Sequence, residues 1–272
     1  MKTTPCKLAL AGLAFAASAA ALSAQTVVAH WTFDDPDNLG YDSSGNALHL
    51  TLPTNPGVSY NEGRLSVGKA SSNYLAAPDN DAFTMNSLTL EVVFELTERS
   101  GTNLGFLAGH FYGANNTRSY ALALDSNAQI RVVLAQSNTA TQYETGYYLT
   151  PGTNYYLAFS VNTSATPSER SLTFYIKDLS TEGSQLQTVS WTGAAVTESF
   201  LLNSTTNFSI GAQGNGSGAD IYSGYFDEVR LSAGVLSEGQ LLIAIPEPSA
   251  FAGLAGLGAV VIAGARRRRR RT

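Results

Sequence analysis

Residues Ser171–Lys177 read SLTFYIK, with apolar side chains at every second position: Leu172, Phe174 and Ile176. Successive side chains of a β-strand point to opposite faces of a sheet, so this spacing puts all three on one face. An amphipathic helix would instead need apolar residues three and four positions apart. The stretch therefore predicts a half-buried strand of an antiparallel sheet.

Similar strand patterns occur on both sides of this stretch. Residues 120–124 (YALAL) and 129–134 (QIRVVL) are separated by the turn residues DSN, which predicts a β-hairpin. Apart from a short stretch at 237–243, no segment before residue 249 shows a sustained 3.6-residue period. The pattern predicts an all-β fold, an antiparallel two-sheet sandwich. Further strands are expected at 88–96, 155–161, 207–211 and 224–231.

The N-terminus differs from this middle region. Residues 1–24 combine two lysines, an apolar Ala-rich run and small residues near the end, which predicts a secretory signal peptide. The only cysteine, Cys6, leaves with this peptide, so no disulfide is expected in the mature chain. The 221 residues from 25 to 245 are enough for one domain.

The charge of this domain bears on its partners. The whole chain has 16 basic and 21 acidic residues, and leaving out Lys2, Lys7, the six terminal arginines and Glu247 leaves 8 and 20. The net charge of the domain is then about −12. Such a surface argues against nucleic acid as a partner and favours cations.

The C-terminus, residues 246–272, has three parts in order. A Pro-Glu-Pro triplet precedes the uncharged run 249–265, which as a helix would span about 26 Å, the lower limit for a bilayer core. The arginines at 266–271 follow, and such a block stays on the cytoplasmic side, so the domain should lie outside. A basic tail that binds nucleic acid is the alternative, but it does not explain the apolar run. The residues assigned to the signal are Pro246, Glu247, Pro248, Arg266, Arg267 and Arg268.

These three parts together resemble the PEP-CTERM sorting signal. The resemblance implies a Gram-negative bacterium and an exosortase, a membrane transpeptidase that cuts near the triplet. It also implies transient anchoring in the inner membrane, followed by release to the cell surface or the extracellular space. The usual associations of this family are with extracellular polysaccharide and biofilm matrix.

A second resemblance covers nearly all of residues 28–243. The ordered segments HWTFDD (30–35), DSSGN (42–46), SLTLEVVF (87–94), GYFDEVRL (224–231) and VLSEGQL (235–241) resemble a LamG-like domain. Such domains belong to the concanavalin A-like lectin/glucanase superfamily, and the resemblance implies a jelly roll of roughly a dozen strands. The segments 101–117 and 164–170 are expected to be loops, and they follow no recognised pattern of this family.

The end segments of a jelly roll often pair, which covers both sheet edges. We then expect Trp31 and Phe33 to point inward from the first strand. Phe226 and Val229 should do the same from the last strand, with a bulge between them.

A structural Ca²⁺ is the expected cofactor, because this pairing brings carboxylates together and like charges repel unless a cation joins them. Ca²⁺ takes six to eight oxygen ligands. The resemblance implies a calcium ion near these motifs. The alternative is a plain turn in which Asp42 bonds its own backbone. The candidate ligands are Asp34, Asp42, Asn46 and Asp227.

Catalysis is not expected. Glu91 and Glu95 share a strand face, but Val93 stands between them, where hydrolases of this superfamily are expected to have Asp. The three histidines lack the spacing of a zinc site, and no nucleophile-elbow motif is present.

A carbohydrate ligand is the expected partner. Tyrosines in or near predicted loops are candidates for stacking on sugars, the alternative being half-buried positions on strands. We therefore expect an exported protein that binds polysaccharide or a matrix component. The alternatives are a divergent glycoside hydrolase or lyase, and a purely structural envelope or biofilm protein. The tyrosines are Tyr112, Tyr143, Tyr147, Tyr148, Tyr155 and Tyr222.

Overall fold

The computed structural model of the protein describes most of the predicted domain. The described residues are 26–51, 57–68, 74–99, 101, 103–112, 117–136, 139–164, 166–196, 205–214 and 222–244. The predicted signal peptide at 1–24 and the predicted sorting signal at 246–272 lie outside these residues. Within them, no helix is both long enough and apolar enough to cross a membrane.

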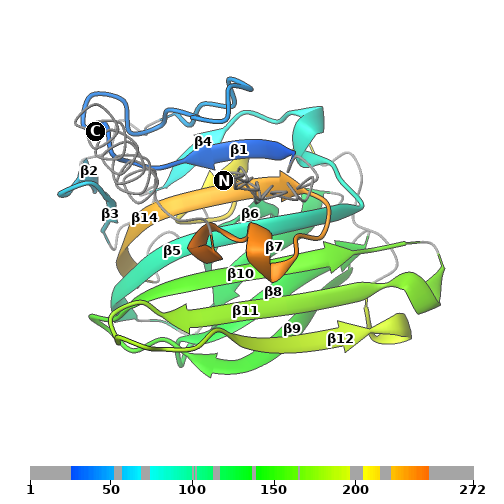
Figure 1. The fold of residues 1–272 in the computed structure, drawn as a ribbon. Helices are drawn as coiled ribbons and strands as arrows, with labels where there is room; N and C mark the ends of the chain where they lie inside the picture. Colours follow the sequence, from blue (N-terminus) through cyan, green and yellow to red (C-terminus); the bar gives the residue numbers. More distant parts are fainter. Residues whose placement is uncertain are drawn as a thin grey trace, which may run out of the picture.

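Two antiparallel sheets pack face to face as a sandwich, which confirms the predicted all-β fold (Figure 1). The larger sheet has the order β12-β11-β10-β5-β14-β3-β2, and β1 pairs with β14 beside β3. Its strands are β1 (Val27–Trp31), β2 (Val58–Tyr60), β3 (Leu65–Val67), β5 (Ser87–Arg99), β10 (Asn154–Asn162), β11 (Ser171–Asp178), β12 (Gln187–Thr192) and β14 (Tyr222–Ala233).

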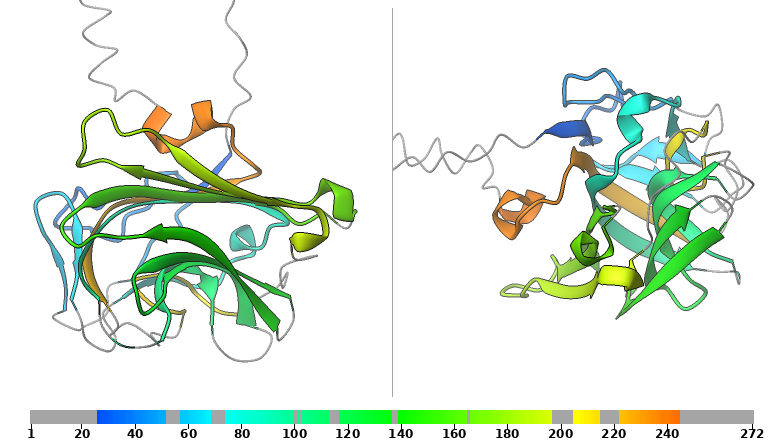
Figure 2. Two further views of the ribbon diagram at one scale, coloured as in Figure 1. Left: turned by 90° about the horizontal axis from the view of Figure 1, so that it is seen from below. Right: turned by 90° about the vertical axis from the view of Figure 1, so that its right-hand side faces the viewer.

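The smaller sheet has the order β4-β13-β6-β7-β8-β9. The two sheets are seen as separate layers in the rotated views of Figure 2. The strands of the smaller sheet are β4 (Leu75–Ala77), β6 (Gly105–Phe111), β7 (Arg118–Leu124), β8 (Gln129–Gln136), β9 (Thr139–Tyr148) and β13 (Phe208–Ile210).

The core lies between the sheets and follows the period of two. On β11 the predicted face of Leu172, Phe174 and Ile176 is buried in this core. On β5 the alternate side chains from Leu88 to Leu96 are buried in the same way. Full burial of each such side chain stabilises the fold by about 1.5–3 kcal/mol, so the apolar alternation drives the packing of the two sheets.

The first and last strands pair, as predicted. Trp31 of β1 lies opposite Val229 of β14, and the register of β14 against β5 shifts between Phe226 and Glu228. This shift is the predicted bulge. Trp31 and Phe33 are buried, Trp31 stacks on Phe208 at 5.2 Å between ring centroids, and its Nε1 donates to the Leu48 carbonyl.

The segment 101–117 was expected to be a loop, and this expectation was wrong, because the segment contains the central strand β6. All seven residues of β6, GFLAGHF, are buried. A strand that is buried on both faces loses the alternation that reveals it. The sequence patterns also missed the short strands β2, β3 and β4 and the edge strands β9 and β12.

The short period at 237–243 corresponds to two single-turn 3₁₀ helices, η5 (Glu238–Gln240) and η6 (Leu242–Ala244). They lie on the outer face of the larger sheet (Figure 2). Leu236 and Leu241 from this segment pack on Val93, Tyr156 and Tyr175. We call residues 235–244 the C-terminal cover. The remaining 3₁₀ helices of the described chain are η1 (Asp81–Phe83), η3 (Pro167–Glu169) and η4 (Gly193–Ala195).

Gly109 of β6 gives a direct test of this packing. A Cβ at this position would lie 2.4 Å from the Tyr120 carbonyl oxygen and 2.6 Å from the Ala121 Cα on β7. Backbone atoms cannot move aside cheaply, so Gly109→Ala should lower the free energy of unfolding by about 1–3 kcal/mol or more. Chemical denaturation measures the change. Gly239→Ala, where a Cβ would meet nothing within 4 Å, is the control and should be neutral. An equal effect of the two substitutions would contradict the placement of β6.

Candidate functional site

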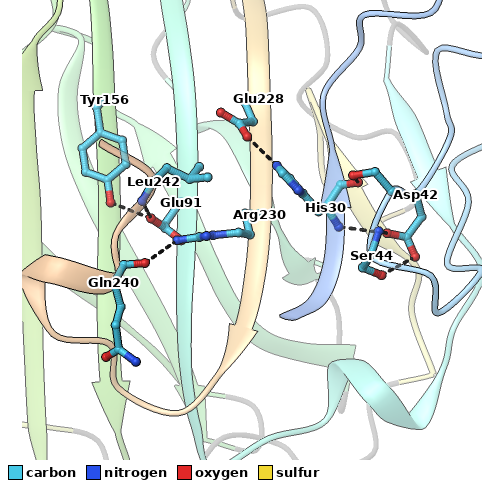
Figure 3. A network of polar contacts seen from close by, with 10 residues as sticks. His30, Asp42, Ser44, Glu91, Tyr156, Glu228, Arg230, Gln240 and Leu242 are labelled. Carbon is cyan, nitrogen blue, oxygen red and sulfur yellow. Dashed lines mark hydrogen bonds and ion pairs between the residues drawn. The ribbon is translucent and has the colours of Figure 1, made fainter. Parts of the chain in front are cut away.

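The outer face of the larger sheet carries a buried ion pair between Glu91 of β5 and Arg230 of β14 (Figure 3). Arg230 Nε donates to Glu91 Oε2 at 2.6 Å, and the Tyr156 hydroxyl donates to Glu91 Oε1 at 2.8 Å. The C-terminal cover completes the arrangement. The Leu242 N–H donates to Glu91 Oε1, and Arg230 Nη2 donates to the Gln240 carbonyl, both at 2.8 Å.

These contacts close the Glu91 carboxylate off from solvent, since its exposed fraction is 0%. Burial raises the pKa of the Tyr156 hydroxyl well above its usual range, and the neighbouring Glu91 raises it further. Tyr156 therefore stays protonated and donates to Glu91. A sugar oxygen reaches Glu91 only if the C-terminal cover moves away.

Glu95 lies on the same face of β5, as predicted, but its environment is different. Its Oε2 accepts a hydrogen bond from Arg64 Nη1 at 2.8 Å, and both side chains are partly exposed. The Arg64 guanidinium also lies 4.5 Å from the centre of the Tyr225 ring, a cation–π contact. Val93, between the two glutamates, is buried under the cover. Each of these two glutamates is thus held by an arginine, so Glu91 and Glu95 of β5 do not form an open pair of carboxyl groups.

A second polar group lies beyond β14, around Asp42 (Figure 3). Asp42 Oδ1 accepts from the His30 and Ser44 backbone N–H groups at 2.9 and 3.0 Å. Its Oδ2 accepts from the Ser44 hydroxyl and the Leu48 N–H, both at 2.9 Å. Burial by itself raises the pKa of Asp42, but the hydrogen bonds from His30, Ser44 and Leu48 outweigh it, and the net pKa is below the usual value. This is the turn geometry that was the alternative to a calcium ligand.

The other candidate calcium ligands have separate placements. Asn46 Nδ2 donates to the Val27 and Val28 carbonyls at 3.0 and 2.9 Å. Asp34 is exposed, and Asp227 lies at the bulge of β14. In the described part of the chain, no three His, Cys, Asp or Glu residues form a group that can hold a metal ion. The donor set therefore fits a turn better than a calcium site, and the calcium ion stays a prediction.

Glu228, which the sequence patterns did not single out, is the carboxylate that joins β14 to β1. It forms an ion pair with His30 Nε2 (Figure 3). His30 lies opposite Arg230, so Glu228 is its diagonal neighbour across the two strands. The predicted bulge could have indicated this contact, because the extra residue Asp227 places Glu228 on the outer face of the sheet.

The aromatic candidates divide between core and surface. Tyr143, Tyr155 and Tyr222 are buried in the core, and Tyr112 and Tyr147 are half-buried. Tyr148 is 55% exposed. Tyr41, which was not predicted, is 51% exposed and stacks on His49 with 5.2 Å between ring centroids.

The histidines are held in three different ways. His110 is fully buried, and its Nε2 donates to the Thr206 carbonyl at 2.9 Å. Burial lowers the pKa of His110, although Thr206 and Asp79 act in the opposite direction, so the ring is a neutral core residue. His30 pairs with Glu228, and His49 is exposed beside Tyr41. None of them belongs to a group of three metal-ligating residues within the described ranges.

Comparison with known proteins agrees with the sandwich. A family model described as the concanavalin A-like lectin/glucanases superfamily matches residues 69–241, more than half of the chain. The chain belongs to this superfamily. Its members include both lectins and glucanases, so membership defines the fold and leaves the activity open. A comparison with curated protein sequences gave no match.

Solved structures of the superfamily fold are similar at low identity. The binding domain of botulinum neurotoxin DC in complex with SialylT is 11% identical, with a TM-score of 0.54 over 78% of this chain and 49% of the toxin chain. A botulinum neurotoxin type C structure, whose cell entry depends on two ganglioside molecules, is 10% identical, with a TM-score of 0.50 over the same shares. Trypanosoma rangeli sialidase is 15% identical, with a TM-score of 0.54 over 78% of this chain and 31% of the sialidase. The chain thus spans about half of the toxin chains and under a third of the sialidase.

The two glutamates of β5 should differ sharply in their effect on stability. Glu91→Gln leaves the Arg230 charge buried without its partner, which should cost about 3–5 kcal/mol of unfolding free energy. Glu95→Gln is the matched control on the same strand face. Because its pair with Arg64 is partly exposed, it should cost no more than about 1 kcal/mol. Denaturant unfolding of both variants measures the difference. Similar small losses of unfolding free energy in both variants would show that the Glu91–Arg230 pair is not shielded from solvent.

The role of Asp42 can be separated from that of calcium. Asp42→Ala leaves the Leu48 and His30 N–H groups without their acceptor and should cost about 1–3 kcal/mol, equally with calcium and with a chelator. The folded-state pKa is below the usual 3.8, so this contribution is present above that pH and is lost as the pH falls through the folded value. Exposed Asp34→Ala is the control and should be neutral. A calcium-dependent rise in melting temperature that Asp34→Ala or Asp227→Ala abolishes would establish the ion instead.

Proposed function

We propose that this chain is an exported, non-catalytic protein that binds carbohydrate. The closure of Glu91 is the observation that carries this proposal. A glycoside hydrolase uses two carboxyl groups that both reach the scissile bond. Here Glu91 is buried under the C-terminal cover and Glu95 is held by Arg64, which favours binding over hydrolysis.

The structural neighbours support the class of ligand. The toxin domains of the same fold were solved with SialylT or are described as depending on gangliosides, and the sialidase has also been solved in complex with sialic acid. The net charge of about −12 for residues 25–245 speaks against nucleic acid. A polysaccharide or another matrix component is therefore the partner that we propose for this domain.

We also propose that the chain is sorted to the cell surface by an exosortase, after transient anchoring in the inner membrane. β1 begins and η6 ends on the same side of the sandwich (Figure 2), and the Ala233 N–H donates to the Thr26 carbonyl beside the start of β1. The Pro246–Pro248 triplet follows η6 after a single intervening residue. A processing enzyme that cuts near the triplet would therefore act next to a folded domain.

The sorting proposal predicts where variants accumulate. Replacing Pro246, Glu247 and Pro248 by alanine should leave the folded domain intact, because the described fold ends at Ala244. Cell fractionation should then find the variant as the full-length chain in the inner membrane, whereas the wild-type protein is at the cell surface or in the medium. Surface release of the variant at the wild-type level would contradict a role for the triplet.

The binding proposal predicts a melting-point shift without chemistry. Purified protein should melt at a higher temperature with at least one polysaccharide from a panel, because a ligand that binds only the folded state stabilises it by mass action. The same incubations should release no reducing sugar and no unsaturated product. Release of either would establish a hydrolase or a lyase. The absence of any shift across the panel would leave a purely structural role.

A further inference from the structure

Two short segments after β1 lie side by side and are clamped by backbone contacts. The Leu50 N–H donates to the Gly40 carbonyl at 2.8 Å, and a Cβ on Gly40 would lie only 2.0 Å from the Leu50 carbonyl oxygen. Only glycine allows so close an approach. Along both segments buried and exposed residues alternate, so Tyr41 and His49 both face solvent while Asp42 is buried between them.

The two exposed rings lie against each other, so one face of each ring is covered by the other. Tyr41 and His49 are stacked, with 5.2 Å between centroids and 22° between planes. The Asp42 backbone N–H donates to His49 Nδ1 at 3.0 Å, which fixes the orientation of the imidazole. Because Nδ1 is the acceptor, the neutral ring carries its proton on Nε2 and can donate it at the surface. We call this pair the aromatic platform.

The geometry points to a binding site for one uncharged hexopyranose unit of a polysaccharide at the aromatic platform. This assignment rests on the carbohydrate-binding function proposed above and gives it a location. The C–H face of a pyranose packs on the face of an aromatic ring, and the Tyr41 hydroxyl and His49 Nε2 can hydrogen-bond its hydroxyl groups. Because the Asp42 N–H already holds the His49 ring, and Tyr41 already stacks on that ring, little side-chain freedom is lost on binding.

The charges around the platform favour a neutral sugar. Residues 26–51 contain four aspartates and no lysine or arginine. Asp35 and Asp37 are exposed. They lie in the turn that leads to Tyr41, in which the Asn38 N–H donates to the Asp35 carbonyl and the Tyr41 N–H donates to the Asn38 carbonyl. Such a negative surface repels the carboxylate of a uronate or a sialate.

Other exposed tyrosines provide the comparison. Tyr148 is 55% exposed and Tyr60 is 40% exposed, but neither stacks on another ring of the described residues. Tyr148 ends β9, one edge of the smaller sheet, whereas Thr51, just beyond the platform, bridges to Ala76 of β4 at the opposite edge. Tyr148→Ala therefore removes an equally exposed ring at a distant place.

Affinity electrophoresis of the purified full-length protein tests the site. Native gels would contain neutral polysaccharides (dextran, glucomannan, galactomannan) or the acidic polymer alginate. We expect retardation by at least one neutral polymer and none by alginate. Tyr41→Ala and His49→Ala should weaken binding at least about tenfold, which is about 1.4 kcal/mol. Tyr41→Phe, which keeps the ring, should retain most of the affinity, and Tyr148→Ala should bind as the wild type does.

The outcomes separate this site from the function as a whole. Binding by the wild type that Tyr41→Ala and His49→Ala leave unchanged, with melting temperatures also unchanged, would overturn the platform and keep the carbohydrate-binding function. Retardation by alginate alone would overturn the preference for neutral sugars. No retardation by any of the polymers would contradict the site and the proposed function together. If Tyr41→Ala or His49→Ala loses binding and also melts at a lower temperature, the Tyr41→Phe variant separates a lost contact from a damaged fold. Failure of Tyr41→Phe to bind would contradict ring stacking.

Discussion

The ion pair between Glu91 and Arg230 joins two strands of the larger sheet across 139 residues of sequence. It connects β5 to β14, reaches β10 through Tyr156, and holds the C-terminal cover through Leu242 and Gln240. Removing two charges from water is costly, and the hydrogen bonds to both Glu91 oxygens and from Arg230 Nε and Nη2 offset this cost. The cover supplies the partners in two of these hydrogen bonds. The chain therefore completes this buried ion pair with its last described residues.

This arrangement has a consequence for chemistry. The face of β5 that carries Glu91 and Glu95 is occupied by two arginine–glutamate pairs and an apolar cover. The carbohydrate site that we propose lies elsewhere. The loop after β1 presents an exposed aromatic pair that is fixed by the buried Asp42 turn. In the same loop, the Leu48 carbonyl accepts a hydrogen bond from the indole N–H of the buried Trp31. The aromatic platform is therefore connected directly to the core.

Much of the fold could be predicted because its signals are local. The alternation at Leu172, Phe174 and Ile176 and the bulge between Phe226 and Val229 follow from the period of two and from apolar identity. β6 escaped prediction because burial on both faces and two glycines remove the alternation. The site was harder to predict. Asp42 was recognised as special, but its partners lie on three different segments, and the stacking of Tyr41 on His49 depends on the close contact at Gly40, which no local pattern reports.

Hydrogen exchange of the Leu242 amide tests the central claim most directly. If the N–H bond to Glu91 closes the outer face, this proton should exchange only through global unfolding, as slowly as the amides of the central strand β5. That result would show that the C-terminal cover is part of the cooperative fold. Exchange of Leu242 at the rate of an unstructured amide, with β5 still protected, would show that the cover opens independently. Glu91 would then be accessible, and the account given for its role would be wrong.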